Sequence, residues 1–254
     1  MHPYFDVPLP HVLAHRGLTW QAGVQAFDEN TLEAFAAAIA AGATHIESDL
    51  QVTKDGVPIL FHDATTDRVS TRHETIANMD FDDVAQITLR FGGRIPTLEA
   101  ALLAFPHAKF NLDFKTAECV VPASRVIAAC DAQERVLIAS FSDRNRRAAQ
   151  KLLPNSPSSA GMTTVALLYL LLALRLSPLA RLLVRRINAV QIPVGSIGLK
   201  FANSSFIRRC RNIGLFVHFW TINKPSQMRR LLLLGASGLV TDRTDLAVTA
   251  AQSL

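Results

Sequence analysis

The sequence alternates short runs of β-branched and apolar residues with longer helical stretches along almost its whole length. Such alternation is typical of βαβ units and favours a parallel sheet that helices enclose. A barrel of eight parallel strands needs ~250 residues, and the chain has 254, so one barrel would use all of it. The runs with strand character are His11–His15, His45–Thr53, Gly56–His62, Lys109–Lys115, Arg135–Phe141, Ser158–Thr163, Ala189–Pro193, Leu215–Ile222 and Gly238–Thr241.

These are nine runs, one more than the eight parallel strands of such a barrel. The shortest connection between two of them explains the extra run. The tight-turn sequence Lys54-Asp55-Gly56 is too short for a parallel crossover, so the runs beside it should form an antiparallel hairpin. We therefore predict an α/β fold: a single (β/α)₈ TIM barrel, with a β-hairpin excursion after the second strand, in one domain spanning residues 1–254. If Val52 pairs with Val57, Glu47 lies opposite His62.

Cysteine usage and the first residues bear on the compartment in which the protein works. Cys119, Cys130 and Cys210 are odd in number and lack CxxC spacing, which argues against a disulfide framework and a cysteine zinc site. Residues 1–10 show no basic stretch followed by an apolar one, so we see no signal peptide. We expect a cytoplasmic protein.

The net charge of +5 is concentrated in the second half of the chain, where arginines cluster near residues 175–186, 208–211 and 229–243. A basic half suits anionic partners such as phosphate esters, a membrane surface or nucleic acid. The sequence shows no helix-turn-helix, RNP or zinc-finger pattern, so we expect no nucleic-acid partner.

Residues 165–187 admit two interpretations. Val165–Leu174 is uncharged and almost wholly apolar, and Arg175 then opens an arginine-bearing stretch. This apolar run is far shorter than the ~20 residues of a membrane span. It fits a barrel helix, or a pair of helices, with an apolar core face. It also fits a basic amphipathic element that makes a peripheral membrane contact.

Two histidines stand where barrel enzymes place their chemistry, at the C-terminal ends of strands. The first strand ends with His15 and Arg16, and the hairpin arm returns with His62. A histidine with a pKa near 6.5 suits proton transfer at neutral pH.

Carboxylates alternate along two of the expected strands. Glu47 and Asp49 share one face of theirs, and Asp113 and Lys115 share one face of the next parallel strand. Three converging carboxylates repel and raise each other's pKa unless a cation lies between them. Carboxylate oxygens favour Mg²⁺ or Ca²⁺ over Zn²⁺. The alternative is that Asp49 or Asp113 only pairs with Arg16 or Lys115.

Short polar motifs recur along nearly the whole chain. They are Ala14-His15-Arg16-Gly17, Glu29-Asn30-Thr31, Glu47-Ser48-Asp49, Lys54-Asp55-Gly56-Val57-Pro58, Phe61-His62-Asp63, Ile95-Pro96-Thr97-Leu98-Glu99, Trp220-Thr221-Ile222-Asn223 and Gly238-Leu239-Val240-Thr241-Asp242. Each motif alone is weak, but the ordered set is specific, and it resembles the glycerophosphodiester phosphodiesterase family in the family's own order. The resemblance implies a metal-dependent (β/α)₈ barrel.

The resemblance implies catalytic roles for His15 and His62. It implies that Glu47, Asp49 and Asp113 bind one divalent cation, Mg²⁺ or Ca²⁺. Asp113 stands where many members have Glu, and its shorter arm would alter the distance to the metal.

The resemblance also implies binding residues. Arg16 and Lys115 would contact the phosphate, and Glu29 and Asn30 match a motif near the glycerol end. Glu29 fits equally well as a cap of the following helix, together with Thr31. Trp220 fits either the barrel core or the mouth, where it would stack on a choline-like head group.

These implications define an expected reaction: hydrolysis of a glycerophosphodiester, as a small-molecule or lipid substrate, to an alcohol and sn-glycerol 3-phosphate. His15 would be the base and His62 the acid. The alternative is an enzyme like lysophospholipase D or sphingomyelinase D that acts on membrane lysophospholipids, favoured by residues 165–187 and the short 64–108 connection. A barrel that only binds ligands is disfavoured, because both histidines and all three carboxylates are present.

Overall fold

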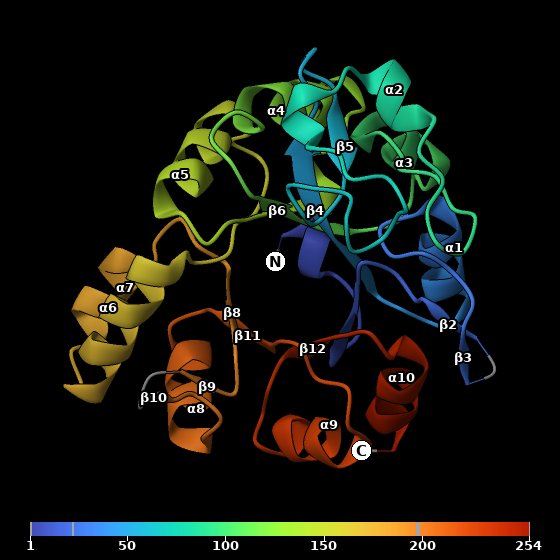
Figure 1. Cartoon of the computed structure of the whole chain (residues 1–254). Coiled ribbons are helices and arrows are strands. Elements are labelled where there is room, and N and C mark those ends of the chain that lie inside the picture. The colour runs from blue at the N-terminus through green and yellow to red at the C-terminus, as the bar shows by residue number, and fades with distance from the viewer. Residues whose placement is uncertain (1, 22, 197–198, 254) are drawn as a thin grey trace.

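Seven parallel strands form one curved sheet in this computed structural model, which describes residues 2–21, 23–196 and 199–253. The strand order is β7-β6-β4-β1-β12-β11-β8, and β5 pairs with β4. Helices surround the sheet as expected for a TIM barrel (Figure 1). The strands are β1 (His11–His15), β4 (His45–Val52), β5 (Pro58–Leu60), β6 (Phe110–Phe114), β7 (Val136–Ala139), β8 (Ala189–Ile192), β11 (Phe216–Phe219) and β12 (Gly238–Thr241).

The helices follow the strands in the alternation that the sequence predicts. Thr31 and Thr97 begin two of them by accepting a hydrogen bond from the amide three residues on, at Ala34 and Ala100. The helices are α1 (Leu32–Ala40), α2 (Phe81–Ala85), α3 (Leu98–Ala104), α4 (Val120–Ala129), α5 (Asp143–Leu152), α6 (Met162–Ala173), α7 (Ser177–Leu183), α8 (Ser204–Asn212), α9 (Pro225–Leu233) and α10 (Thr244–Gln252).

The strand predicted at Ser158–Thr163 is much shorter than expected. Parallel bridges join only Ser158 to Ile138 and Ser159 to Ala189, and Met162 already belongs to α6. These two bridges nevertheless close the barrel between β7 and β8. The strand is short because the chain leaves the sheet after Ser159 and begins α6 at Met162. In place of the predicted eighth strand, the barrel therefore has only these bridges at Ser158 and Ser159, which we call the seam.

The predicted hairpin is present, with its register shifted by one residue. Val52 pairs with Pro58 instead of Val57, and the ladder ends at the pair of Leu50 and Leu60. Five residues, 53–57, connect Val52 to Pro58, and among them Gly56 adopts a φ of +88°, a conformation that glycine adopts without strain. His62 is therefore not the cross-strand partner of Glu47.

Two further antiparallel strand pairs have no counterpart among the predicted elements. β2 (Trp20–Gln21) pairs with β3 (Val24–Gln25), and β9 (Gly195–Ser196) pairs with β10 (Leu199–Lys200). Strands of two residues are too short to give a periodic sequence signal.

The N-terminal end of the barrel is closed by a plug of aromatic and histidine side chains. Tyr4 and Phe5, in a short 3₁₀ helix, are buried there with His11, His45 and His218. His11 and His218 approach to 3.1 Å between ring nitrogens. Gly238 lies between them in register, and its lack of a side chain leaves room for that contact.

Residues 165–187 lie mainly in two packed helices, α6 and α7. This agrees with the interpretation of the segment as a pair of barrel helices with an apolar core face. Val165, Leu168 and Leu172 face the core. Among the described residues, no helix is both long and apolar enough to cross a membrane.

Candidate active site

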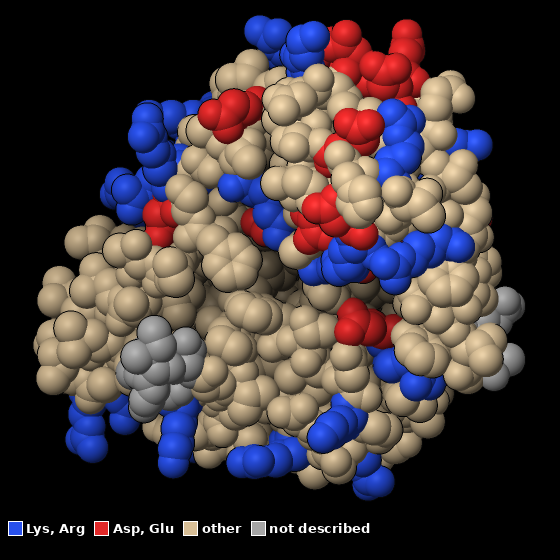
Figure 2. Space-filling view, viewed as in Figure 1, with Lys and Arg blue, Asp and Glu red and all other residues tan. Residues whose placement is uncertain are grey.

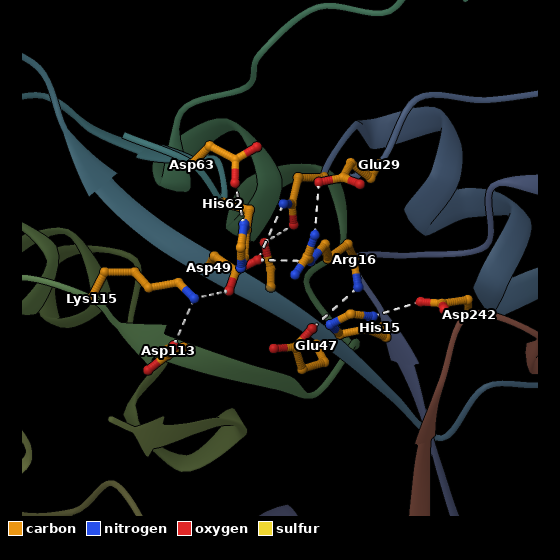
Figure 3. A network of polar contacts seen from close by, with 12 residues as sticks. His15, Arg16, Glu29, Glu47, Asp49, His62, Asp63, Asp113, Lys115 and Asp242 are labelled. Carbon is orange, nitrogen blue, oxygen red and sulfur yellow. Dashed lines mark hydrogen bonds and ion pairs between the residues drawn. The ribbon is translucent and has the colours of Figure 1, made fainter. Parts of the chain in front are cut away.

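The chemistry-bearing side chains lie side by side because their strands are parallel and in register. His15 on β1 pairs with Glu47 on β4, which pairs with Asn111 on β6. Two residues further along, Asp49 pairs with Asp113. Since residues two apart share a face, all these side chains line one cavity at the C-terminal end of the barrel, and Figure 3 shows His15, Glu47, Asp49 and Asp113 side by side.

A cavity of about 500 Å³ opens at this end of the barrel. One part of its wall is polar and contains both histidines, the three carboxylates, Arg16 and Lys115. Another part is apolar and includes Phe141, Met162 and Phe201. Figure 2 shows a hollow on this face, with charged side chains beside it and uncharged surface across from them. The cavity can therefore hold a charged group at one wall and an apolar group at the other.

His15 is held in a fixed orientation by a carboxylate that follows β12. Its Nδ1 lies 2.5 Å from Asp242 Oδ1, so Nδ1–H donates to the carboxylate and Nε2 is left for the cavity. Asn223 donates to Asp242 Oδ2 at 2.6 Å and so fixes the carboxylate in turn. Burial lowers the pKa of His15, but the charges of Glu47 and Asp242 outweigh burial and raise the pKa above its ordinary value.

His62 is arranged in the same way on the other side of the carboxylate cluster. Its Nδ1 donates to Asp63 at 2.6 Å, and Asp63 also accepts from Arg68 at 2.7 Å. Arg68 extends to Glu29 through two hydrogen bonds, of 2.8 and 2.6 Å. Both imidazoles are thus oriented through Nδ1, an arrangement suited to proton transfer at Nε2.

Two cations neutralise part of the carboxylate cluster. Lys115 Nζ lies 2.9 Å from Asp49 and 3.1 Å from Asp113, and Arg16 Nε lies 3.2 Å from Asp49. Burial raises the pKa of Asp49, and Lys115 and Arg16 more than offset this and lower it. Burial and then the charge of Asp49 raise the pKa of Glu47 to about 8.

The donor set at this end of the barrel fits a hard divalent cation. As the side chains stand, no group of His, Cys, Asp and Glu in the described residues is arranged to hold a metal ion. Lys115 instead bridges two of the carboxylates. Asn111 Oδ1, however, is buried and has no hydrogen-bond partner, and Glu47 lies beside it with a disfavoured charge. Oxygen donors that lack a counter-charge are what Mg²⁺ and Ca²⁺ bind.

Neither Glu29 nor Asn30 lines the cavity. Asn30 is 1 % exposed, accepts from Ser48 at 2.6 Å and donates to Asp49 at 3.4 Å. Glu29 binds Arg16 at 3.0 Å, and Thr31, not Glu29, caps α1. The capping interpretation is therefore confirmed for Thr31 and wrong for Glu29, and contact of Glu29 or Asn30 with the substrate stays a prediction.

Trp220 lies at the cavity wall, and its ring meets Phe141 edge to face with centroids 5.9 Å apart. Of the two positions that the sequence left open for Trp220, the barrel core and the mouth of the cavity, the structure shows the mouth. Stacking on a head group stays a prediction.

Sequence reasoning did not assign Asp242, Asp63 or Arg68 to the site. The two aspartates were visible inside the motifs Gly238–Asp242 and Phe61–Asp63, so a search for a carboxylate partner of each histidine would have found them. Arg68 gave no such signal, because only the folded 64–97 connection brings it to Glu29.

The fold and the site define a class: a TIM-barrel enzyme with two oriented histidines and a buried carboxylate cluster at the C-terminal ends of its strands. The sequence profile of the glycerophosphoryl diester phosphodiesterase family matches residues 15–246. The chain belongs to this family and is a phosphoric diester hydrolase.

Individual relatives agree with this assignment. A probable glycerophosphodiester phosphodiesterase 2 of Mycobacterium tuberculosis is 37% identical over 237 residues, covering 92% of this chain and 88% of the relative. The crystal structure of a glycerophosphodiester phosphodiesterase from Agrobacterium tumefaciens shares the fold, with a TM-score of 0.77, 21% identity and coverage of 97% and 100%. The structure of an Oleispira antarctica phosphodiesterase in complex with the product sn-glycerol-3-phosphate also shares the fold. Its TM-score is 0.73, its sequence identity is 22%, and the match covers 95% of this chain and 96% of that one.

Proposed function

We propose that this enzyme hydrolyses glycerophosphodiesters to an alcohol and sn-glycerol 3-phosphate by metal-dependent catalysis with two histidines. One observation carries the proposal. Two imidazoles, each oriented by a carboxylate through Nδ1, flank a cluster of three carboxylates and two cations in one cavity. The product-bound relative from Oleispira antarctica supports the glycerol phosphate end of the substrate.

The residues divide the work by charge. Arg16 and Lys115 attract the anionic phosphodiester and offset the charge that builds on its oxygens. Glu47, Asp49 and Asp113 would hold one Mg²⁺ or Ca²⁺. When bound, the ion supplies further stabilisation of charge on the phosphoryl oxygens.

The proton transfers belong to the histidines. His15 takes the proton of the attacking hydroxyl, and His62 gives a proton to the leaving alkoxide. A hydroxyl of the substrate's own glycerol is close enough to its phosphate to attack, which forms a cyclic phosphate and releases the alcohol. Water then opens the cyclic ester to glycerol phosphate.

The test is release of sn-glycerol 3-phosphate from glycerophosphocholine, with EDTA and with Mg²⁺ or Ca²⁺ added back. His15→Ala and His62→Ala should each reduce kcat/KM by ~100-fold or more, since one proton-transfer group typically contributes 10²–10⁴. His73→Ala, at an exposed histidine that also binds an aspartate, is the matched control and should keep full activity. Undiminished turnover by either site variant, or turnover indifferent to EDTA, would overturn the proposal.

The apolar wall supports a second candidate, a lysophospholipase D- or sphingomyelinase D-like reaction. Phe141, Met162 and Phe201 offer an acyl chain a surface that glycerophosphocholine does not need. Measuring choline release from both lysophosphatidylcholine and glycerophosphocholine distinguishes the two, because this cleavage of lysophosphatidylcholine yields choline and lysophosphatidic acid and no glycerol 3-phosphate. A higher kcat/KM for choline release from lysophosphatidylcholine than from glycerophosphocholine would favour the second candidate.

A further inference from the structure

Charge divides this molecule along the chain. Residues 144–241 contain 15 Lys and Arg and not one Asp or Glu, so all 21 acidic residues lie outside these 98 positions. The stretch runs from α5 to the end of β12 and makes up about half of the barrel. On the face drawn in Figure 2, the lower part shows blue side chains and no red ones, and the red ones lie in the upper part and beside the hollow.

The two helices at the edge of this basic half have an unusual composition for a barrel surface. A helix on a globular surface is polar on its outer side, but α6 has no charged side chain and is mostly apolar around its whole circumference. Leu167, Leu170 and Leu174, spaced three and four residues apart, expose 43, 53 and 60% of their area. On α7, Leu179 and Leu182 expose 51 and 61%.

The arginines of this segment lie among or next to the exposed leucines. Arg175, Arg181, Arg185 and Arg186 are all exposed, and residues 162–187 contain no acidic side chain. Exposed leucines together with arginines are the composition of elements that lie in the interface of a bilayer. Figure 1 shows α6 and α7 at the outer edge of the barrel.

The same helix forms part of the active-site cavity. Met162, Val165 and Ala166, in the first turns of α6, line the cavity, and Met162 is itself 68% exposed. Phe141, on the adjoining wall, is 58% exposed. The apolar wall of the cavity is therefore continuous with the outer apolar surface of α6.

We propose that the outer surface of α6 and α7 docks onto an anionic lipid bilayer. The leucines enter the boundary between headgroups and acyl chains, and the four arginines bind headgroup phosphates. A second copy of this chain fits less well, because it would bring two basic halves together. The docking surface goes beyond the proposed reaction, and its binding is measured without substrate.

The test is co-sedimentation of the full chain with vesicles of phosphatidylcholine alone, and of phosphatidylcholine with phosphatidylglycerol. We expect binding to the anionic vesicles at least tenfold tighter than to the neutral ones, and weakened by salt. The double variant Leu170→Glu/Leu174→Glu should lower binding at least tenfold. The matched control is Leu103→Glu, at a leucine on α3 with 63% exposure, and it should bind as the wild type does.

Each remaining outcome decides the question. Neither Leu170 nor Leu174 lines the cavity, so the double variant should hydrolyse a soluble substrate at the wild-type rate, which also shows that it is folded. Equal binding of the wild type to neutral and anionic vesicles would overturn the proposal. So would binding that the double variant retains, or a dimer in sedimentation velocity that only the double variant abolishes.

Discussion

The three buried histidines at the N-terminal end of the barrel should make this protein sensitive to mild acid. Burial, and then the charge of Lys109, lower the pKa of His11 from the ordinary 6.5 to about 4. Burial and the neighbouring His11 lower that of His45 to about 3. Burial likewise lowers the pKa of His218 well below 6.5. All three are therefore neutral in the folded protein at pH values where they are charged in the unfolded chain.

The sign follows from proton binding. Between pH ~7.5 and ~5.5 the unfolded chain takes up protons at these histidines and the folded protein does not, so stability falls as the pH falls. At pH ~5.5 a histidine with an unfolded pKa of 6.5 favours unfolding by about 1.4 kcal/mol, and at pH ~7.5 by less than ~0.1 kcal/mol. The value of 1.4 kcal/mol per histidine depends little on the pKa in the folded protein, provided that this pKa lies well below the pH of the measurement. The three histidines together would cost about 4 kcal/mol, a large share of a typical stability of ~5–15 kcal/mol.

A single substitution isolates the effect. Glu47, with a pKa raised to about 8, acts in the opposite direction over the same range, because the folded protein binds its proton more tightly. Comparing His11→Gln with the wild type at both pH values cancels this contribution. We expect the loss of stability between pH ~7.5 and ~5.5 to be about 1.3 kcal/mol smaller in the variant, whatever its stability at neutral pH.

The measurement is urea unfolding followed by far-UV circular dichroism at the two pH values. His73→Gln is the control, because that side chain is 78% exposed and meets water in both states. A pH dependence of His11→Gln that matches the wild type within ~0.3 kcal/mol would refute the argument from burial.

Three further predictions concern the site and the core. Asp242→Asn removes a charge that raises the pKa of His15, so kcat/KM should fall ~10- to 100-fold and the pH–rate profile should move to lower pH; an unmoved profile contradicts this orienting role. Gly17→Ala places a Cβ 2.7 Å from the main chain of Ala34 at a φ of +86°, which should destabilise the fold by ~1–3 kcal/mol in thermal and urea unfolding, and wild-type stability would count against the close approach. Phe110→Ala empties a fully buried position and should cost ~3–5 kcal/mol in urea unfolding; a loss under ~1 kcal/mol would show that the core is less tightly packed there.

The sequence was sufficient for the parts of the fold that depend on periodicity and on short turns. Lys54-Asp55-Gly56 required a hairpin, and β4 and β5 form one. The register was wrong by one residue because the turn type, not the strand pattern, sets it. The run at 158–163 had the residues of a strand, but no sequence pattern showed that the chain leaves the sheet there to begin α6.

The candidate site divides in the same way. Alternation along a strand was enough to place Glu47 beside Asp49, and Asp113 beside Lys115. The carboxylate partners of the histidines come from β12 and from the residue after His62, and their roles depend on distances of 2.5–2.6 Å that no spacing rule supplies. Arg68 depends wholly on tertiary folding.

The seam at Ser158 and Ser159 gives the barrel a line along which it can open. Each neighbouring strand is joined to it by only a few backbone hydrogen bonds, among them Ser159 N to Ile138 O at 3.0 Å and Ala160 N to Ala189 O at 2.9 Å. Other neighbours in the sheet share longer ladders, such as the five registered pairs of β4 with β6. Amide protons at the seam should therefore exchange with solvent sooner than those of the central strands. Opening there would separate β7 from β8 and loosen the apolar side of the cavity. The histidines and carboxylates would stay in place, because β1, β4 and β6 remain paired with one another.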